Sequence, residues 1–180
     1  MTGAIFVELK KYVEARLGSD AWNHLLSAAR LSGKEFSILE HYPDEHAVAL
    51  VAAAVEATGK SAAEILEDFG TFLAPDLLEM FWGAIQPEWR TLDVIEHTEQ
   101  AIHSVVRLEN PGARPPELRV SRTSPSEVVI DYRSPRRMCA LARGIARGLA
   151  AHFRESVEVS ESECMHGGDE RCLIAVRLSA

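Results

Sequence analysis

The stretch Tyr132-Arg133-Ser134-Pro135-Arg136 joins an apolar run, Val128-Val129-Ile130, to a long helical pattern that begins near Arg136. It brings together a phenol, a hydroxyl and a permanently charged guanidinium, all of which donate hydrogen bonds. Such a set of donors suits a pair of carboxylates or a phosphate. The stretch therefore predicts an anion-binding site, with an ordinary strand end followed by a helix cap as the alternative.

His103 is the second candidate site residue. In the helix predicted after Arg90, at about 100° per residue, His103 lies about 20° from Leu92 and about 60° from Val106, on an apolar face. A histidine there is either a core residue or a ligand. Burial favours the neutral imidazole, which is the form that binds heme iron. The remaining histidines that we considered lack this setting and are predicted to be structural or surface residues: His24, His41, His46, His97 and His152.

Composition limits the classes of protein to which the chain can belong. Its 180 residues, 47% hydrophobic and 26% charged, predict one soluble globular domain spanning residues 1–180. The formal charge of −8, spread along the chain, argues against nucleic acid or an anionic membrane as a partner. The N-terminus lacks the apolar run of a signal peptide, so we expect a cytoplasmic protein.

The order of sequence patterns predicts an α+β fold. Helical patterns run from Ile5 to a stop at Gly18, through Trp22, from Pro43 to Gly59, and from a capping box at Ser61. Pro75 and Pro87 bracket an aromatic segment. A hairpin around Ser124-Pro125-Ser126, a helix from about Arg136 to Phe153 and two last strands follow. We therefore expect a helical N-terminal half, then a small antiparallel sheet packed with one long helix.

These features together resemble the heme nitric oxide/oxygen-binding family, the H-NOX domains, which include the heme domain of soluble guanylate cyclase. The resemblance extends from Gly3 to Leu178. It is carried by these residues in this order: Gly3, Ile5, Phe6, Tyr42-Pro43-Asp44, Phe69-Gly70, His103, Gly112-Ala113, Pro115-Pro116, the Tyr-x-Ser-x-Arg motif, Gly144 and Gly148.

The resemblance implies a binding site for heme b between the two halves of the protein. His103 would ligate the iron, Tyr132, Ser134 and Arg136 would hold the propionates, and Pro116 would pack against the porphyrin. Oxygen-binding members carry a tyrosine five positions beyond the arginine, and this chain has Leu141 there. The other matching pocket positions are apolar too: Ile5, Leu9 and Ile145.

The resemblance and the apolar pocket predict a sensor rather than an enzyme. Bound oxygen is held by a hydrogen-bond donor, whereas nitric oxide binds ferrous heme without one. We therefore expect a nitric oxide sensor that excludes oxygen, binds carbon monoxide more weakly, and signals when the bond between iron and His103 breaks. The signal would pass to a separate protein, and the resemblance suggests a histidine kinase or a cyclic-di-nucleotide enzyme.

The cysteines support a second prediction. Three cysteines in a reducing compartment do not suit a disulfide framework, so they are either buried thiols or metal ligands. Some H-NOX proteins carry a structural zinc, and Cys139, Cys164 and Cys172 match three of its ligand positions. At the fourth position this chain has Glu161, with His166 as a nearby substitute. The alternative function is accordingly a zinc or thiol redox sensor, or a heme-free scaffold, on the same fold.

Overall fold

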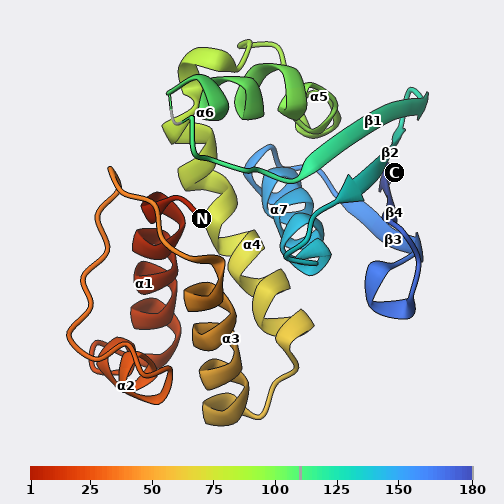
Figure 1. Cartoon of the computed structure of the whole chain (residues 1–180). Helices are drawn as coiled ribbons and strands as arrows, with labels where there is room; N and C mark the ends of the chain where they lie inside the picture. Colours follow the sequence, from red (N-terminus) through yellow and green to blue (C-terminus); the bar gives the residue numbers. More distant parts are fainter. Residues whose placement is uncertain (110, 180) are drawn as a thin grey trace.

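The computed structural model describes residues 1–109 and 111–179, so Asn110 of the proline-rich turn and Ala180 lie outside the described residues. The N-terminal half is helical and the C-terminal half contains the sheet, with the long helix α4 reaching from one half into the other (Figure 1). The N-terminal helices are α1 (Gly3–Leu17), α2 (Ala21–Ala28), α3 (Asp44–Thr58) and α4 (Ala62–Met80).

The ends of these helices follow the predicted local signals. Helix α1 stops at Gly18, whose φ is 94°, and α3 stops at Gly59, whose φ is 70°. Only glycine adopts such backbone angles without strain. At the start of α4, the Ser61 hydroxyl accepts the Glu64 backbone N–H at 3.2 Å, and the Glu64 carboxylate accepts the Ser61 N–H at 2.8 Å. The predicted capping box is therefore present.

Three local details differ from the sequence patterns. Helix α4 continues through Pro75 to Met80, so this proline lies inside a helix. Helix α7 (Cys139–His152) begins three residues beyond Arg136, because the chain turns there with Arg137 at a φ of 50°. The helix after Arg90 is also interrupted: α5 (Thr91–His97) leads into a π-helical turn (Thr98–His103) and then α6 (Ser104–Glu109).

The C-terminal half contains one four-stranded antiparallel sheet in the order β1-β2-β4-β3. Its strands are β1 (Glu117–Ser124), β2 (Glu127–Arg133), β3 (Val157–Glu163) and β4 (Cys172–Leu178). Strands β1 and β2 form the predicted hairpin, and α7 connects β2 to β3. The α+β architecture predicted from the sequence is therefore confirmed.

Among the described residues, the buried hydrophobic side chains form two cores. One lies among α1 to α4 and includes Phe6, Leu50 and Leu73, all fully buried or nearly so. The other lies between the sheet, α5 and α7 and includes Val128 and Ile174. Helices α4 and α7 run side by side between the two cores (Figure 1). The space between the cores is therefore bounded by these two helices.

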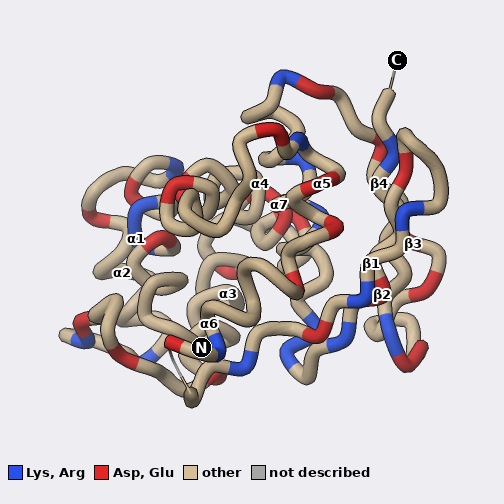
Figure 2. The backbone as a smooth tube through the Cα atoms, turned by 90° about the horizontal axis from the view of Figure 1, so that it is seen from above, with Lys and Arg blue, Asp and Glu red and all other residues tan. Residues whose placement is uncertain are grey.

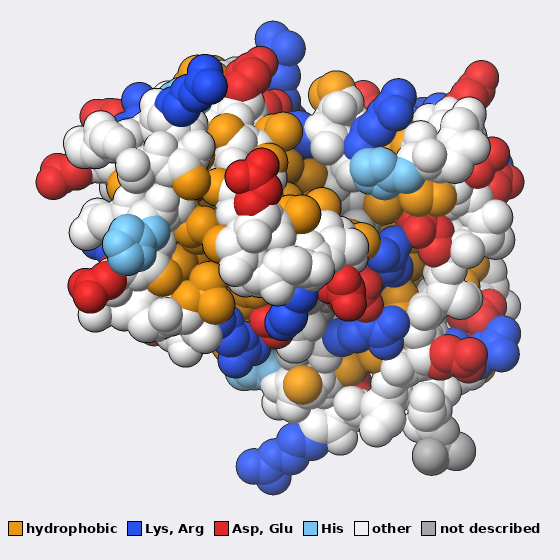
Figure 3. Space-filling model, turned by 90° about the horizontal axis from the view of Figure 1, so that it is seen from below, with side chains coloured by type: hydrophobic (Ala, Val, Ile, Leu, Met, Phe, Trp, Pro, Cys, Tyr) orange, Lys and Arg blue, Asp and Glu red, His pale blue; other side chains and the backbone are white. Residues whose placement is uncertain are grey.

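Charged residues of both signs are interspersed along the backbone (Figure 2) and on the face shown in Figure 3, where hydrophobic side chains lie mainly in the hollows. Many of these charges pair across elements, as Arg122 of β1 does with Glu96 and Asp93 at 2.7 Å each. Among the described residues, no helix combines the length and apolar character that a bilayer crossing requires.

Candidate functional site

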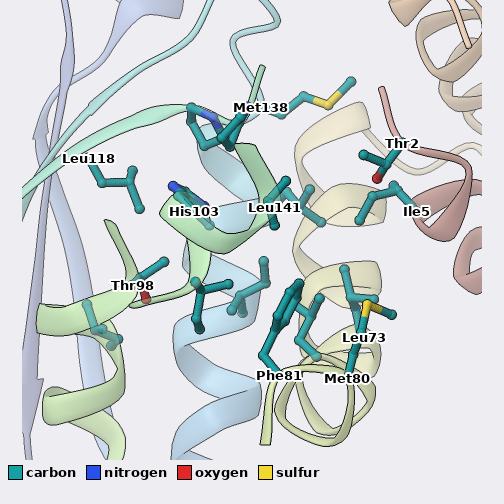
Figure 4. Close-up of a pocket in the computed structure, with 18 of the residues that line it drawn as sticks. Thr2, Ile5, Leu73, Met80, Phe81, Thr98, His103, Leu118, Met138 and Leu141 are labelled. Carbon is teal, nitrogen blue, oxygen red and sulfur yellow. The ribbon is translucent and has the colours of Figure 1, made fainter. Parts of the chain in front are cut away.

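A cavity of about 270 Å³ lies between the two halves, close to the lower end of the usual range of small-molecule sites, about 300–1,000 Å³. His103 enters it from one side and Ile5 of α1 lies on the opposite side, with Leu141 between them (Figure 4). Most of the remaining wall is apolar, including Leu73, Leu77, Phe81, Ile102, Pro115, Leu118, Met138, Ile145 and Leu149.

His103 is the last residue of the π-helical turn, and its side chain is only 14% exposed. Its Nδ1 atom lies 2.9 Å from the Glu99 carboxylate, one turn earlier. Burial lowers the pKa of His103, although the hydrogen bond with Glu99 acts in the opposite direction. The ring is therefore neutral near pH 7. With the proton on Nδ1, toward Glu99, the lone pair is on Nε2.

The π-helical turn explains how the histidine is placed. A π-helical turn adds a residue to a helical turn, and such turns are frequent at functional sites. The regular 3.6-residue spacing from Leu92 therefore does not hold as far as His103, and its direction follows from the turn itself. The ring nevertheless faces the cavity, as predicted.

The residues of the predicted anion clamp lie at the end of β2. Tyr132 and Arg136 line the cavity, and Ser134 is buried beside it, where its hydroxyl accepts the Arg136 N–H at 3.3 Å. The Arg136 guanidinium donates to Asp44 at 3.2 Å and to the Arg114 carbonyl oxygen at 2.6 Å. It is therefore held at the cavity wall, with its side chain 12% exposed.

Asp44 holds the arginine from the helical half. It accepts from the N-terminal ammonium of Met1 at 2.8 Å as well as from Arg136. Burial alone would raise the pKa of Asp44, but the hydrogen bonds and charges of these two cations hold it below its ordinary value. Asp44 is therefore an anion that links the N-terminus, the start of α3 and the β2 end.

Of the four apolar pocket positions predicted from the sequence, Ile5, Leu9, Leu141 and Ile145, three line the cavity and one does not. Ile5, Leu141 and Ile145 line the cavity, and so does Pro116 beside Pro115. Leu9 is buried in the core of the helical half instead, one turn beyond Ile5 along α1. The side chains of Ile5, Leu141 and Ile145 are hydrocarbon and offer no hydrogen-bonding group to the cavity.

The cysteines form a separate cluster on the other side of α7. One ligand atom each from Cys139, Glu161, Cys164 and Cys172 lies within 4.8 Å of all the others. The Sγ atom of Cys164 is 3.7 Å from that of Cys139 and 3.8 Å from that of Cys172. His166 points elsewhere, with its Nε2 atom 2.6 Å from the Arg137 carbonyl oxygen. Of the two predicted fourth ligands, the structure places Glu161 with the thiols.

The cavity fits heme in its chemistry. Its walls are apolar, as a porphyrin ring requires, and a neutral imidazole on one side can bind iron. Arg136, whose side chain is mostly covered, lies at the cavity wall and could pair with the carboxylates of a bound group. These features define a class of protein: an α+β heme-binding domain in which His103 is the histidine among the described cavity residues and the candidate iron ligand.

Comparisons with known proteins agree with this class. The sequence model of the Haem-NO-binding family matches residues 2–161. An H-NOX protein from S. oneidensis, solved in the Fe(II)NO state, is 23% identical, with both chains covered in full and a TM-score of 0.93. An Fe(II)CO structure of an H-NOX domain from Shewanella oneidensis is also 23% identical, with 99% of each chain covered and a TM-score of 0.88. The unliganded Fe(II) H-NOX protein from K. algicida is 19% identical, covers 100% and 97%, and gives a TM-score of 0.86.

The chain belongs to the Haem-NO-binding, or H-NOX, family of heme-based gas-sensing domains. The membership suggested by the sequence is therefore confirmed. A search among curated proteins found no match.

Two residues that support the site were not predicted from the sequence. Glu99 precedes His103 by four positions, a spacing that places two side chains on one helical face. That spacing could have identified it. Asp44 contributed to the resemblance but was given no role, because its partners, the N-terminus and Arg136, are distant in sequence.

Proposed function

We propose that the protein is a heme-based nitric oxide sensor that excludes oxygen and signals to a separate effector protein when the iron loses His103. The proposal rests chiefly on the cavity, which has His103 on one side and the hydrocarbon side chains of Ile5, Leu141 and Ile145 elsewhere on its wall. Heme bound there would supply a ferrous iron to which nitric oxide and, more weakly, carbon monoxide bind.

Selectivity in this proposal follows from the lack of a hydrogen-bond donor at Leu141. Oxygen on ferrous iron acquires negative character and needs such a donor, whereas nitric oxide does not. The threonine, tyrosine and arginine side chains that line the described cavity are at Thr2, Thr98, Arg114, Tyr132 and Arg136. Of these, the Thr98 hydroxyl donates to the Val94 carbonyl oxygen at 2.7 Å, and Arg136 donates to Asp44 at 3.2 Å.

The proposed signal uses the position of His103 between the two halves. His103 belongs to the segment before β1, whereas Ile5 and Leu73 belong to the helical half. Releasing the histidine would free that segment from the group bound between the halves. A shift from 1:99 to 99:1 between two states requires about 5.5 kcal/mol of differential binding. Nitric oxide would supply it by binding more tightly to iron that has lost the histidine. The proposed effector is a histidine kinase or a cyclic-di-nucleotide enzyme, by analogy with the family.

The first test is the visible spectrum of the purified, dithionite-reduced protein, recorded before and after nitric oxide and again in air. We expect nitric oxide to shift the ferrous Soret band to the position typical of a five-coordinate nitrosyl heme, in which the histidine is no longer bound. In air we expect no stable shift. His103→Gly should remove the initial histidine-ligated spectrum. A protein that takes up no heme, or one that binds oxygen stably, would contradict the proposal.

A second proposal concerns the cysteine cluster, which we infer to be a structural zinc site. Zinc bonds to sulfur at about 2.3 Å, so two thiolates of a tetrahedral site lie about 3.8 Å apart. The two Sγ distances given above agree with this value. The buried Oε1 atom of Glu161 has no hydrogen-bond partner among the described residues, and Arg143 binds Oε2 at 2.6 Å. Glu161 therefore offers a free oxygen to a metal.

The thiols would have to lose their protons to bind zinc. Burial raises the pKa of Cys139, and burial raises that of Cys172 to about 11, so both thiols are protonated at neutral pH in a metal-free protein. Metal binding would therefore release protons. Measuring the zinc content of purified protein, with Cys172→Ser as the comparison, tests the proposal. Equal, near-zero zinc in both proteins would contradict it.

A further inference from the structure

The Glu99 carboxylate contacts the ring of His103 and two further groups. Its Oε2 atom lies 2.9 Å from His103 Nδ1 and accepts the Leu118 backbone N–H at 3.3 Å. Its Oε1 atom accepts from Arg107 at 2.6 Å. The carboxylate thus has three partners, one in its own turn, one in α6 and one in β1, and its side chain is 24% exposed.

These contacts fix both the charge and the position of Glu99. The Arg107 guanidinium lies 2.6 Å from Oε1 and forms an ion pair with Glu99 as a carboxylate. Arg107 and the Leu118 N–H hold the carboxylate from two further directions. The carboxylate is therefore fixed against the imidazole rather than free to rotate into solvent.

An ionised carboxylate against Nδ1 has a defined effect on the other ring nitrogen. It holds the proton on Nδ1, so that Nε2 carries the lone pair, and it fixes the plane of the ring. It also increases the electron density of the imidazole and makes it a stronger base toward a metal. A neutral acceptor at the same place would orient the ring but would donate less charge.

We propose that Glu99 is the positioning residue that sets the strength of the bond between His103 and heme iron, and so the threshold at which nitric oxide breaks that bond. This inference rests on the proposed function. In its terms, Glu99 strengthens the histidine ligand and delays its release. Because the same carboxylate accepts the Leu118 N–H, movement of the freed histidine would be transmitted directly to β1, at the edge of the sheet.

The test replaces Glu99 with glutamine, which keeps the size and an acceptor oxygen but removes the charge. In the ferrous Glu99→Gln protein we expect the iron–histidine stretching band, measured by resonance Raman spectroscopy, to move to lower frequency. After mixing with nitric oxide, we expect the histidine to leave the iron about tenfold faster in the variant, as measured by stopped-flow absorption. Removing a hydrogen-bond partner of a metal ligand typically lowers metal affinity or activity 10–100-fold. The matched control is Glu109→Gln, the same change at an exposed residue at the end of α6.

The outcomes separate the two proposals. If wild-type protein shows no iron–histidine band, the proposed function fails. If the wild-type band is present and Glu99→Gln matches wild type and the control in both band and rate, only the role of Glu99 is overturned.

A second measurement needs no variant. In the ferrous carbon monoxide form, labelled with ¹⁵N-histidine, a carboxylate-bound Nδ1 proton of His103 should resonate far downfield and exchange slowly with water. A proton in fast exchange would contradict the inference even if Glu99→Gln failed to fold.

Discussion

Replacing Gly144 with alanine tests the close contact between α4 and α7. A Cβ atom at Gly144 would lie 2.1 Å from the backbone oxygen of Glu67 and within 3 Å of its carbonyl carbon and Cα. Ordinary contacts begin at 3.4 Å, so the helices would have to separate by more than an ångström. No change of rotamer can relieve the overlap, because all three atoms belong to the backbone.

The loss of folding stability expected for Gly144→Ala can be estimated from the contacts around this residue. Overpacking costs roughly 1–3 kcal/mol, and the upper end applies to a backbone clash. Separating the helices also weakens the hydrogen bond from the Thr71 hydroxyl to the Gly144 carbonyl oxygen, 3.2 Å long, which contributes about 1 kcal/mol. Alanine gains about 1 kcal/mol over glycine in a helix. The net loss of stability is therefore about 3 kcal/mol.

For a domain of this size, a loss of about 3 kcal/mol lowers Tm by roughly 6–12 °C. Circular dichroism melts of the Gly144→Ala protein would measure it. Gly83→Ala is the control, because nothing lies within 4 Å of a Cβ there, and its Tm should stay within about 2 °C of wild type. A Gly144→Ala protein that melts with the control would refute the account of the helix contact.

Three further substitutions test the site and its surroundings. Leu141→Tyr places a phenol at the cavity wall, and we expect the ferrous variant, unlike wild type in the proposed function, to show a stable spectral change in air; an unchanged spectrum in air would contradict the proposed selectivity. Arg136→Leu removes the cation at the wall, and we expect about tenfold faster transfer of heme to apomyoglobin, since an ionic hydrogen bond contributes about 1.5–3 kcal/mol; an unchanged rate would mean that the arginine does not hold the propionates. Because the folded-state pKa of Asp44 is lowered, its contribution to stability is present above the unfolded value of 3.8 and is lost as pH falls through the folded pKa. Asp44→Asn should therefore flatten the acid limb of a stability profile measured by urea unfolding, and an unchanged limb would show that the ion pairs contribute little.

Local sequence signals predicted most of the fold because each acts within a few residues. Gly18, Gly59 and the Ser61 capping box set helix ends through backbone angles and hydrogen bonds of neighbouring residues. Pro75 lies within α4 although proline is costly inside a helix, because the packing of Leu73 and Leu78 on both sides of it involves the whole protein. Tertiary packing overrode the propensity.

The site was harder to predict, because its parts meet only after folding. His103 and the anion clamp were recognisable from residue type and order, but the π-helical turn that directs the histidine follows no hydrophobic period. Leu9 was predicted to line the pocket, but it lies in the core of the helical half instead. The cluster around Cys139 depends on a bulge in β3 between Glu161 and Glu163, where the register against β4 shifts. No spacing in the sequence indicates that bulge.

The two cores meet within α4, and this suggests where a shift between the halves is absorbed. Leu73 belongs to the core of the helical half, and the next residue, Ala74, belongs to the core beneath the sheet. Pro75 follows directly and has no backbone N–H, so the carbonyl of Thr71 loses its helical partner there. Bending is easiest where the helical hydrogen-bond ladder is interrupted. The same helix lines the cavity through Leu73 and Leu77, so in the proposed function a change at the bound group would act on α4 where that helix resists bending least.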